Sequence, residues 1–379
     1  MKKLKILELT NFSAGACGVW TRVLAESREL KKLGYNVMIF SSQATKGSDK
    51  VAPSEDIIEG IEIKRFSFKK MGGESFMSWK FEEEALKFKP DIIIAHVYRH
   101  PHTTKALKLA KKINAKCFLV THAPFIEGNF TRSRLSKIAI QYYDSVLGPS
   151  RKLNQFDKVI AITKWERPHL LALSINPKKI RYIPNGIPQQ FFIQKLAKEE
   201  NKVLFFGRIS PIKGIETLIE AFAKIKDKKI SLEIVGPAEA EYLSKLKQLV
   251  KSKHLENRII FSEPIFNMSD KIKKLDSAKI FVLPSKRDAM PQSLIEAMSR
   301  KKLVISSSSQ GGREIISNKE NGLLFNIGSS EQLSEAINFS LDPSNKTIIE
   351  KIKKQARKSV QQYSWDELGK VLEKTILEA

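Results

Sequence analysis

The sequence predicts an α/β protein made of two Rossmann-like domains in tandem. Short β-branched runs alternate with amphipathic helical patterns in the first half of the chain, and the alternation starts again near residue 203. Strands this apolar are typical of parallel sheets that helices cover on both faces. The length of 379 residues also exceeds what one hydrophobic core normally holds. We therefore expect two parallel sheets that face an interdomain cleft, where ligands bind outside the carboxyl ends of the strands.

The first domain begins with an apolar run and a helical pattern that stops at Gly34, a typical helix-ending residue. A helix is expected over residues 19–33, and strands are expected over residues 5–9, 36–41, 61–68, 91–96, 116–122, 158–163 and 180–184. The second domain repeats this order. Its helices are expected over residues 215–226, 240–254 and 291–302, and its strands over residues 203–206, 231–235, 258–261, 280–283, 304–307 and 323–325.

Turn residues between positions 184 and 188 mark the junction of the two domains. We expect an N-terminal domain over residues 1–190 and a C-terminal domain over residues 191–363. The last helical pattern has Ser364 as its N-cap and no strand after it. We expect residues 364–379 to form a helix that packs back toward the N-terminal domain.

The composition is that of an ordinary globular protein, with 42% hydrophobic and 28% charged residues. Two cysteines, Cys17 and Cys117, are too few for a disulfide framework and lack metal-ligand spacing, which indicates a reducing compartment. The first apolar run is too short for a signal-peptide core or a membrane span. We expect a cytoplasmic protein.

A formal net charge of +25 is the unusual feature of the composition. Residues 101–190 carry 16 Lys and Arg against 4 Asp and Glu. Solvated surface lysines, an anionic membrane surface and nucleic acid would each explain such an excess. No RNA-binding motif or aromatic stacking pattern accompanies the charge, so nucleic acid is not expected as a partner.

Two segments at expected strand ends are suited to binding an anion. Gly15 to Gly18 is a glycine-bearing turn before a helix, where backbone N–H groups and the helix dipole favour negative charge. Arg208 ends a strand and Lys213 precedes a helix, and two such cations can hold a diphosphate. Taken alone, the first segment is also consistent with a tight turn and the second with solvated cations.

Two further segments carry candidate catalytic side chains. Asp288 lies in a loop after a strand and Glu296 lies in the second turn of the next helix, so the two carboxylates can accept from sugar or ribose hydroxyls. His122 ends a first-domain strand and can donate to a sugar or acceptor hydroxyl, with His96 as a second candidate on the neighbouring strand. The alternatives are an exposed helical glutamate and a core histidine.

Together these segments resemble the retaining glycosyltransferases of family four, the glycosyl transferases group one, which have the GT-B fold. The resemblance implies an N-terminal acceptor domain and a C-terminal domain that binds a nucleotide diphosphate sugar. It spans nearly the whole chain and rests on the ordered set of Gly15 to Gly18, Ile183-Pro184-Asn185-Gly186, Gly207-Arg208 with Lys213-Gly214, Asp288 with Glu296, and Gly312 with Glu314.

The resemblance implies a role at the donor nucleotide for five residues. Arg208 and Lys213 would bind the diphosphate and act in the transition state, and Glu296 would hold the ribose hydroxyls. Gly15 and Gly18 would also lie at the nucleotide.

The resemblance also implies which residues contact the reacting sugar. Asp288 occupies the place of a family glutamate that contacts the transferred sugar, and its shorter side chain leaves the identity of that sugar open. The backbone of Ala289 and Met290 would face the sugar, whereas Pro291 has no N–H to donate. His122 would lie beside the reacting centre, so we expect His122 and Asp288 to be catalytic together with the two diphosphate-binding cations.

Sugar transfer without a metal ion is the expected mechanism. Fixed cations and helix dipoles can stabilise the leaving diphosphate, and no Asp-x-Asp at a strand end is present to hold a metal. The expected partners are a nucleotide-sugar donor and a glycan or lipid-linked acceptor, with no cofactor. A nucleotide-sugar 2-epimerase of the same fold is the alternative enzyme.

The segment of residues 131–143 combines cations with an apolar stripe at helical spacing. Arg132, Arg134 and Lys137 lie off that stripe, as in a helix that lies on an anionic bilayer. The segment is equally consistent with a helix that packs on the first sheet. Peripheral attachment to the inner face of the membrane is therefore a further expectation.

Overall fold

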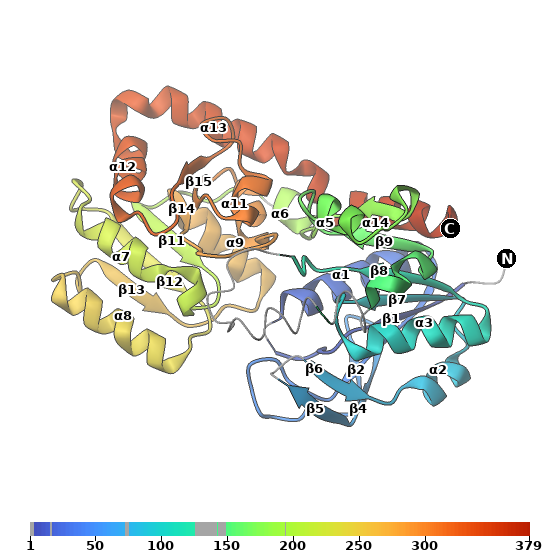
Figure 1. The fold of residues 1–379 in the computed structure, drawn as a ribbon. Coiled ribbons are helices and arrows are strands. Elements are labelled where there is room, and N and C mark those ends of the chain that lie inside the picture. The colour runs from blue at the N-terminus through green and yellow to red at the C-terminus, as the bar shows by residue number, and fades with distance from the viewer. Residues whose placement is uncertain (1–3, 16, 73–75, 126–141, 143–148, 194) are drawn as a thin grey trace. The chain divides into compact units, whose positions relative to one another are not determined.

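The computed structural model describes residues 4–15, 17–72, 76–125, 142, 149–193 and 195–379. Of these, the residues up to Gly186 form one compact unit together with Trp365–Ala379, and Ile187–Ser364 form a second unit. The division therefore lies slightly before the boundary expected after residue 190. Each unit has its own largely parallel sheet with helices around it, which confirms the predicted α/β class with two Rossmann-like domains (Figure 1).

The sheet of the first unit has eight strands in the order β10-β9-β8-β7-β1-β2-β4-β3. Neighbouring strands pair in parallel, except for the antiparallel pair of β3 and β4. The strands are β1 (Lys5–Leu9), β2 (Asn36–Ser42), β3 (Glu55–Ile58), β4 (Ile61–Phe66), β7 (Ile92–His96), β8 (Lys116–Val120), β9 (Lys158–Ala161) and β10 (Ile180–Tyr182).

Two expectations for this sheet need correction. The strand expected over residues 61–68 ends at Phe66, and a separate hairpin of β5 (Phe68–Gly72) and β6 (Phe76–Trp79) follows it. The antiparallel edge strand β3 was not expected, because its burial alternates weakly and its side chains are largely solvated. Edge strands carry little of the apolar signal that identifies a central strand.

The helices of the first unit follow the amphipathic patterns of the sequence. They are α1 (Gly18–Lys32), α2 (Glu82–Phe88), α3 (Pro101–Ile113), α5 (Glu166–Ala172) and α14 (Trp365–Leu377), with short 3-10 turns at Pro149–Gln155 and Pro177–Lys179. The C-terminal helix α14 packs on α1: the guanidinium of Arg22 lies 5.4 Å from the ring centre of Trp365. A Cβ at Gly369 would lie 2.9 Å from Cβ of Glu29, so the two helices approach closely.

The sheet of the second unit has six parallel strands in the order β13-β12-β11-β14-β15-β16. The strands are β11 (Lys202–Phe206), β12 (Ser231–Val235), β13 (Ile259–Ser262), β14 (Ile280–Leu283), β15 (Leu303–Ser307) and β16 (Leu323–Phe325). The helices are α6 (Gln190–Ile193), α7 (Ile215–Ala223), α8 (Ala240–Ser252), α9 (Met268–Ser277), α10 (Gln292–Ser299), α11 (Gln310–Ile315), α12 (Ser330–Leu341) and α13 (Lys346–Ser359).

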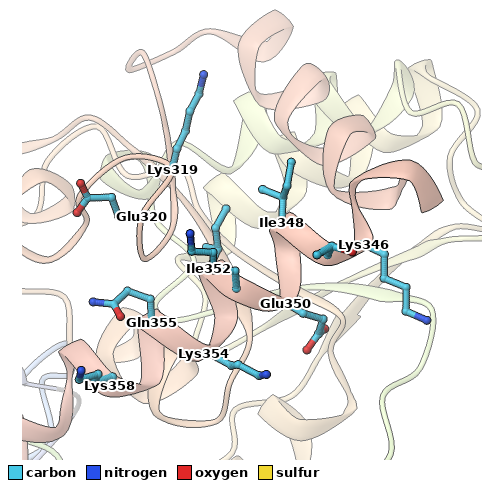
Figure 2. A pocket seen from close by; sticks show the side chains of 11 residues that line it. Lys319, Glu320, Lys346, Ile348, Glu350, Ile352, Lys354, Gln355 and Lys358 are labelled. Carbon is cyan, nitrogen blue, oxygen red and sulfur yellow. The ribbon is translucent and has the colours of Figure 1, made fainter.

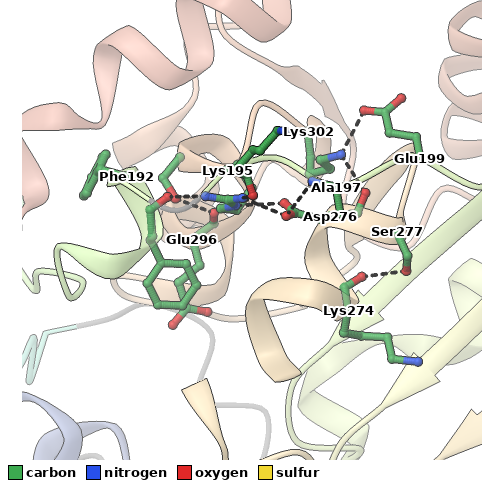
Figure 3. Close-up of polar contacts among 12 residues, drawn as sticks. Phe192, Lys195, Ala197, Glu199, Lys274, Asp276, Ser277, Glu296 and Lys302 are labelled. Atoms are coloured by element: carbon green, nitrogen blue, oxygen red, sulfur yellow. Dashed lines mark hydrogen bonds and ion pairs between the residues drawn. The ribbon is translucent and has the colours of Figure 1, made fainter. Parts of the chain in front are cut away.

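A buried arginine ties the start of the second unit to its core. Arg300 follows α10 and donates to both carboxylate oxygens of Asp276 on α9, at 2.8 and 2.7 Å. It also donates to the carbonyl oxygens of Phe191 and Lys195, at 3.0 and 3.1 Å. Asp276 accepts a further bond from the N–H of Ala197 at 3.1 Å (Figure 3). One ion pair therefore fixes α6 and the segment that leads into β11.

No helix in the described part of the chain combines the length and the apolar character needed to cross a membrane. The basic segment expected at residues 131–143 lies outside the described residues, apart from Tyr142.

Candidate functional site

The predicted donor-binding residues lie at the carboxyl ends of β11 and β14. These strands are neighbours in the sheet, although β12 and β13 lie between them in the sequence. The strand order therefore reverses at this point, and open α/β sheets bind ligands at such a switch. Arg208 and Lys213 follow β11, and Asp288 follows β14.

Lys213 and Asp288 form an ion pair. Nζ of Lys213 lies 2.6 Å from Oδ2 of Asp288, and the two side chains are 19% and 17% exposed. The backbone joins the same two loops, because the N–H of Lys286 donates to the carbonyl oxygen of Ile212 at 2.9 Å. A cation and a hydrogen-bond acceptor thus lie side by side at the switch point, which suits the junction between a sugar and a diphosphate.

Two glycines allow these loops to approach each other. Gly214 has φ +61°, and a Cβ there would lie 2.5 Å from the carbonyl oxygen of Pro284. A Cβ at Gly311 would lie 2.8 Å from the carbonyl oxygen of Asp288, which accepts a bond from the N–H of Gly311 at 2.8 Å. Neither position has room for a side chain, so both glycines shape the site.

Ala289 and Met290, the expected sugar-binding residues, lead from Asp288 into α10. Met290 is 5% exposed, so its side chain belongs to the core and only its backbone remains for a ligand. Pro291 is the N-cap residue of α10 and makes no side-chain capping bond. The amino end of this helix carries partial positive charge, which favours a nearby anion.

Glu296 is buried in α10 rather than exposed on it. It is 6% exposed, and Oε1 accepts a bond from Nζ of Lys271 at 2.6 Å. Among the described residues, Oε2 is buried without a hydrogen-bond partner. An unsatisfied buried acceptor in the helix that follows β14 fits a ligand hydroxyl, which would supply the missing donor.

Lys271 on α9 was missed by the sequence analysis. Its Nζ lies 5.8 Å from the ring centre of Phe191 and 5.3 Å from that of Phe206, and its side chain is 23% exposed. These rings hold the ammonium group against Glu296. Nothing in the sequence distinguishes Lys271 from the many solvated lysines of the chain, because its acidic partner lies on another helix.

Arg208 stands apart from the other donor-binding residues. Its side chain is 53% exposed, with Nη1 3.7 Å from Oε1 of Glu239. In the described part of the chain, no hydrogen bond or ion pair joins it to Lys213 or Asp288. The loop after β12 packs closely against the backbone that precedes Arg208. A Cβ at Gly236 in this loop would lie 2.0 Å from the carbonyl oxygen of Gly207.

The carboxylates Glu296 and Asp288 should have separable effects on ligand binding. We expect Glu296→Gln to weaken binding of a free nucleoside diphosphate and of the whole donor, because the open oxygen of Glu296 would hold ribose. Asp288→Asn should weaken binding of the whole donor only. Calorimetric titration of both ligands into each variant checks this split, and equal effects of the two variants on the free nucleotide would contradict it.

In the first unit, the backbone conformation and the close packing at position 15 require a glycine. Gly15 has φ +83°, and a Cβ there would lie 2.3 Å from the carbonyl oxygen of Lys46. Gly18 differs, because the space beside it is open and Cys17 makes no side-chain capping bond to α1. The structure therefore gives Gly15 a packing role and places Gly18 at the first position of α1, where the helix dipole favours an anion.

A buried network of charged side chains lies at the carboxyl ends of β1 and β7. Nε2 of His96 lies 2.8 Å from Oε2 of Glu8 and 3.1 Å from Oε1 of Glu26. Arg22 donates from Nε to Oε2 of Glu26 at 3.0 Å. All four side chains are fully buried. His122, which is partly exposed, meets this network through Nε2, 2.9 Å from Nδ1 of His96.

The network shifts the pKa values of its members. Burial opposes the charged form of His96, but Glu26 and Glu8 outweigh burial and raise the pKa of His96 to about 9. Burial and the charge of Glu26 raise the pKa of Glu8 to about 7. Burial and the positive charges of His96 and Arg22 hold the pKa of His122 well below its usual value. At neutral pH His96 is therefore a cation and His122 is neutral.

His122 lies in a left-handed turn, with φ +56° at His122 and +53° at Ala123. The strand expected over residues 116–122 accordingly ends at Val120. Glu166 holds the turn: its carboxylate accepts bonds from the hydroxyl of Thr121 and from the N–H of Ala123, the latter at 3.0 Å. Non-glycine residues adopt this conformation at a cost of about 1–3 kcal/mol each, and such strain is typical of functional sites.

Among the described residues, one group could hold a metal ion by proximity: Glu8, Glu26 and His96, whose ligand atoms lie within 4.8 Å of one another. The guanidinium of Arg22 already bonds to Glu26 and supplies positive charge in the same place. We therefore interpret the group as an internal ion-pair network. The expectation of a donor site without a metal ion stays a prediction.

A large pocket formed by described residues lies elsewhere in the second unit. It has a volume of about 1150 Å³ and is lined by α13 and the loop at Lys319 and Glu320 (Figure 2). Helix α13 contributes the side chains of Lys346, Lys354 and Lys358 to the lining of this pocket. None of the predicted site residues lines this pocket, so volume alone does not locate the chemistry.

Two family models match the chain. Residues 16–191 match the model described as Glycosyltransferase Family 4, and residues 186–359 match the model described as Glycosyl transferases group 1. The boundary between the models coincides with the division between the two units.

Individual proteins are also similar to the chain, at low sequence identity. An uncharacterized glycosyltransferase of Methanocaldococcus jannaschii is 27% identical over 52% of this chain and 52% of its own length. The capsular polysaccharide biosynthesis glycosyltransferase CapH of Staphylococcus aureus is 22% identical over 75% of this chain and 76% of its own. The structure of Anabaena HepE in complex with UDP-glucose has a TM-score of 0.75 and 17% identity, and the match covers 99% of this chain and 100% of that one.

The match spans about half the length of the archaeal relative, and the likeness to the solved structure shows the fold alone. The two family models, however, together match residues 16–359. The chain therefore belongs to the glycosyltransferases of the GT-B fold, with a family 4 module followed by a group 1 module.

Proposed function

We propose that the protein transfers a sugar from a nucleotide diphosphate sugar to a glycan or lipid-linked acceptor, with retention of configuration and without a metal ion. The arrangement that carries the proposal is the ion pair of Lys213 and Asp288 at the switch point between β11 and β14, together with the buried carboxylate of Glu296 in α10, the helix that follows β14. It combines a cation for a phosphate, an acceptor for a sugar hydroxyl and an unsatisfied buried oxygen for a ribose hydroxyl.

The proposed roles are those that the resemblance implies, and the position of each side chain supports them. Lys213 stabilises the negative charge that develops on the leaving diphosphate, and the exposed Arg208 adds a second cation. Glu296 holds the ribose, and Lys271 keeps its carboxylate in place. Asp288 contacts the transferred sugar. Because fixed cations neutralise the diphosphate, the transfer needs no metal.

The relatives support the substrate classes in this proposal. HepE was solved with UDP-glucose, so a nucleoside diphosphate glucose is the first donor to test. CapH acts in capsular polysaccharide biosynthesis, which supports a glycan as the acceptor. The family models describe glycosyltransferases, so a nucleotide-sugar 2-epimerase is not favoured.

A thermal-shift panel of UDP-, GDP- and ADP-sugars tests the donor site. We expect one nucleotide class to raise Tm, because a ligand that binds only the native state stabilises it by RT ln(1 + [L]/Kd), about 2.7 kcal/mol at one hundred times Kd. EDTA should leave the shift unchanged, since the proposed site uses lysine and arginine in place of a metal. No shift with any donor, or a shift that depends on a divalent cation, would contradict the proposal.

Peripheral attachment to an anionic membrane is a separate part of the proposal, and the charge of +25 supports it. Each cation near such a surface contributes about 1 kcal/mol. We expect the protein to sediment with anionic vesicles at low salt and to be released at high salt, whereas neutral vesicles should not bind it. If it stays in the supernatant with anionic vesicles at low salt, the charge serves solvation only.

A further inference from the structure

We propose that the buried pair of Glu8 and His96 fixes the ring of His122 as a neutral hydrogen-bond donor with its proton on Nδ1. In this arrangement His122 binds a substrate oxygen and does not act as the general base. Glu8 and His96 are then positioning residues for a ring that they hold from behind. Only the identity of the bound oxygen rests on the proposed function; the position of the proton does not.

Nε2 of His96 faces two carboxylates. It hydrogen-bonds to Oε2 of Glu8 at 2.8 Å, and Oε1 of Glu26 lies 3.1 Å away. Although burial opposes its charge, Arg22 and His96 lower the pKa of Glu26, so this carboxylate is ionised at neutral pH and can only accept a hydrogen bond. Nε2 of His96 therefore carries a proton.

Nδ1 of His96 also carries a proton, because of the charge balance in the network. Glu8 and Glu26 bring two negative charges into a fully buried site, and Arg22 brings one positive charge. Burying an unbalanced charge is costly, and one further proton removes the imbalance. That proton resides on His96 and not on Glu8, because the pKa of His96 is raised to about 9 and the pKa of Glu8 only to about 7. His96 is then an imidazolium, and Nδ1 donates as well.

The two protons on His96 determine the tautomer of His122. Nδ1 of His96 lies 2.9 Å from Nε2 of His122, so a donating Nδ1 requires Nε2 of His122 to accept. A neutral histidine that accepts at Nε2 carries its proton on Nδ1. The pKa of His122, which burial and the charges of His96, Arg22 and His100 hold well below its usual value, agrees with a neutral ring.

The exposed side of the ring points to a ligand. His122 is partly exposed, and among the described residues Nδ1 has no hydrogen-bond partner. Glu166 holds the His122 turn in its left-handed conformation. The chain thus fixes both the backbone conformation and the tautomer of His122. Its Nδ1–H can then donate to an oxygen atom of a ligand. Since Nδ1 is already protonated, the acceptor's proton must be taken by another group.

Nitrogen-15 NMR of the six histidines tests the proposal in the free protein, without any substrate. We expect Nδ1 of His122 to carry the proton and Nε2 to be bare, with both nitrogens of His96 protonated at neutral pH. His102 serves as an internal reference of the opposite kind, because its Nε2 donates to the carbonyl oxygen of His96 at 2.7 Å. A His122→Gln variant assigns the signals.

Glu8→Gln is the decisive variant, because it leaves Glu26 and Arg22 balanced without a charge on His96. We expect His96 to lose its second proton and His122 to change tautomer, so that Nε2–H donates to His96 and Nδ1 becomes bare. Glu29→Gln is the matched control on α1, since Glu29 pairs with Lys32 outside the network and should leave both rings unchanged.

Two outcomes would overturn the proposal. The first is a proton on Nε2 of His122 in the unaltered protein, which would place the shared proton on Glu8 and make His96 neutral. The second is a Glu8→Gln variant that keeps the wild-type tautomer of His122 while its other signals remain native. The first readout needs no variant, so misfolding of Glu8→Gln cannot hide a failure, and neither outcome bears on whether the donor site binds a nucleotide sugar.

Discussion

Replacing Lys213 by alanine is expected to lower turnover by roughly two to three orders of magnitude, the usual effect of removing one preorganised electrostatic donor. The ammonium group is held in place before any ligand arrives, because Asp288 binds it at 2.6 Å. A diphosphate that leaves during transfer would gain this cation without reorganisation. The loss should appear in turnover as well as in donor affinity, because the interaction strengthens as the leaving group gains charge.

Two controls separate this effect from a loss of structure. Lys245→Ala removes an exposed lysine that pairs with Glu241 on α8, and it should leave turnover unchanged. The double variant Lys213→Ala/Asp288→Ala removes both partners, so no carboxylate stays unpaired. If the double variant recovered full turnover, Lys213 would matter only as the partner of Asp288. Arg208→Ala should show a loss of the same order, and full activity in either single variant would remove that cation from the mechanism.

The fold was predictable from the sequence wherever strands are apolar on both faces. Runs such as Lys5–Leu9 and Ile92–His96 are central and buried, and their limits were predicted to within a residue. The edge strand Glu55–Ile58 was not predicted, because its side chains face solvent and its pattern is that of a loop. Strand ends were overestimated where the chain turns sharply, as it does after Val120.

The candidate site was predictable in part, because backbone position follows from strand ends but side-chain partners do not. The sequence places Lys213 and Asp288 in loops after two strands, and the strand order of the sheet brings them into contact. Lys271 and Glu8 could not be identified as site residues, because the role of each depends on a partner far away in the sequence. The signal that was available for Glu8 is a lone acidic residue inside an apolar central strand.

Arg300→Ala is expected to lower the free energy of unfolding of the second unit by about 3–5 kcal/mol, because it leaves a buried carboxylate without its partner. Arg300 is fully buried and Asp276 is 2% exposed, so water cannot replace the lost bonds. The same change frees the carbonyl oxygens of Phe191 and Lys195. Urea unfolding followed by circular dichroism measures the loss, and α6 should become the first segment to exchange its amide hydrogens.

A paired substitution distinguishes the cost of an unpaired charge from the worth of the ion pair itself. Arg300→Met with Asp276→Leu removes both charges and keeps most of the buried volume, and such replacements are often neutral in other proteins. We expect the double variant to unfold at a higher urea concentration than Arg300→Ala. The double variant should still be less stable than the unaltered protein. The bonds of Arg300 to the Phe191 and Lys195 carbonyls connect α6 to the core, and methionine cannot donate to them. If the double variant matched the unaltered protein in both stability and hydrogen exchange at α6, neither the backbone bonds nor the ion pair of Arg300 would contribute net stability.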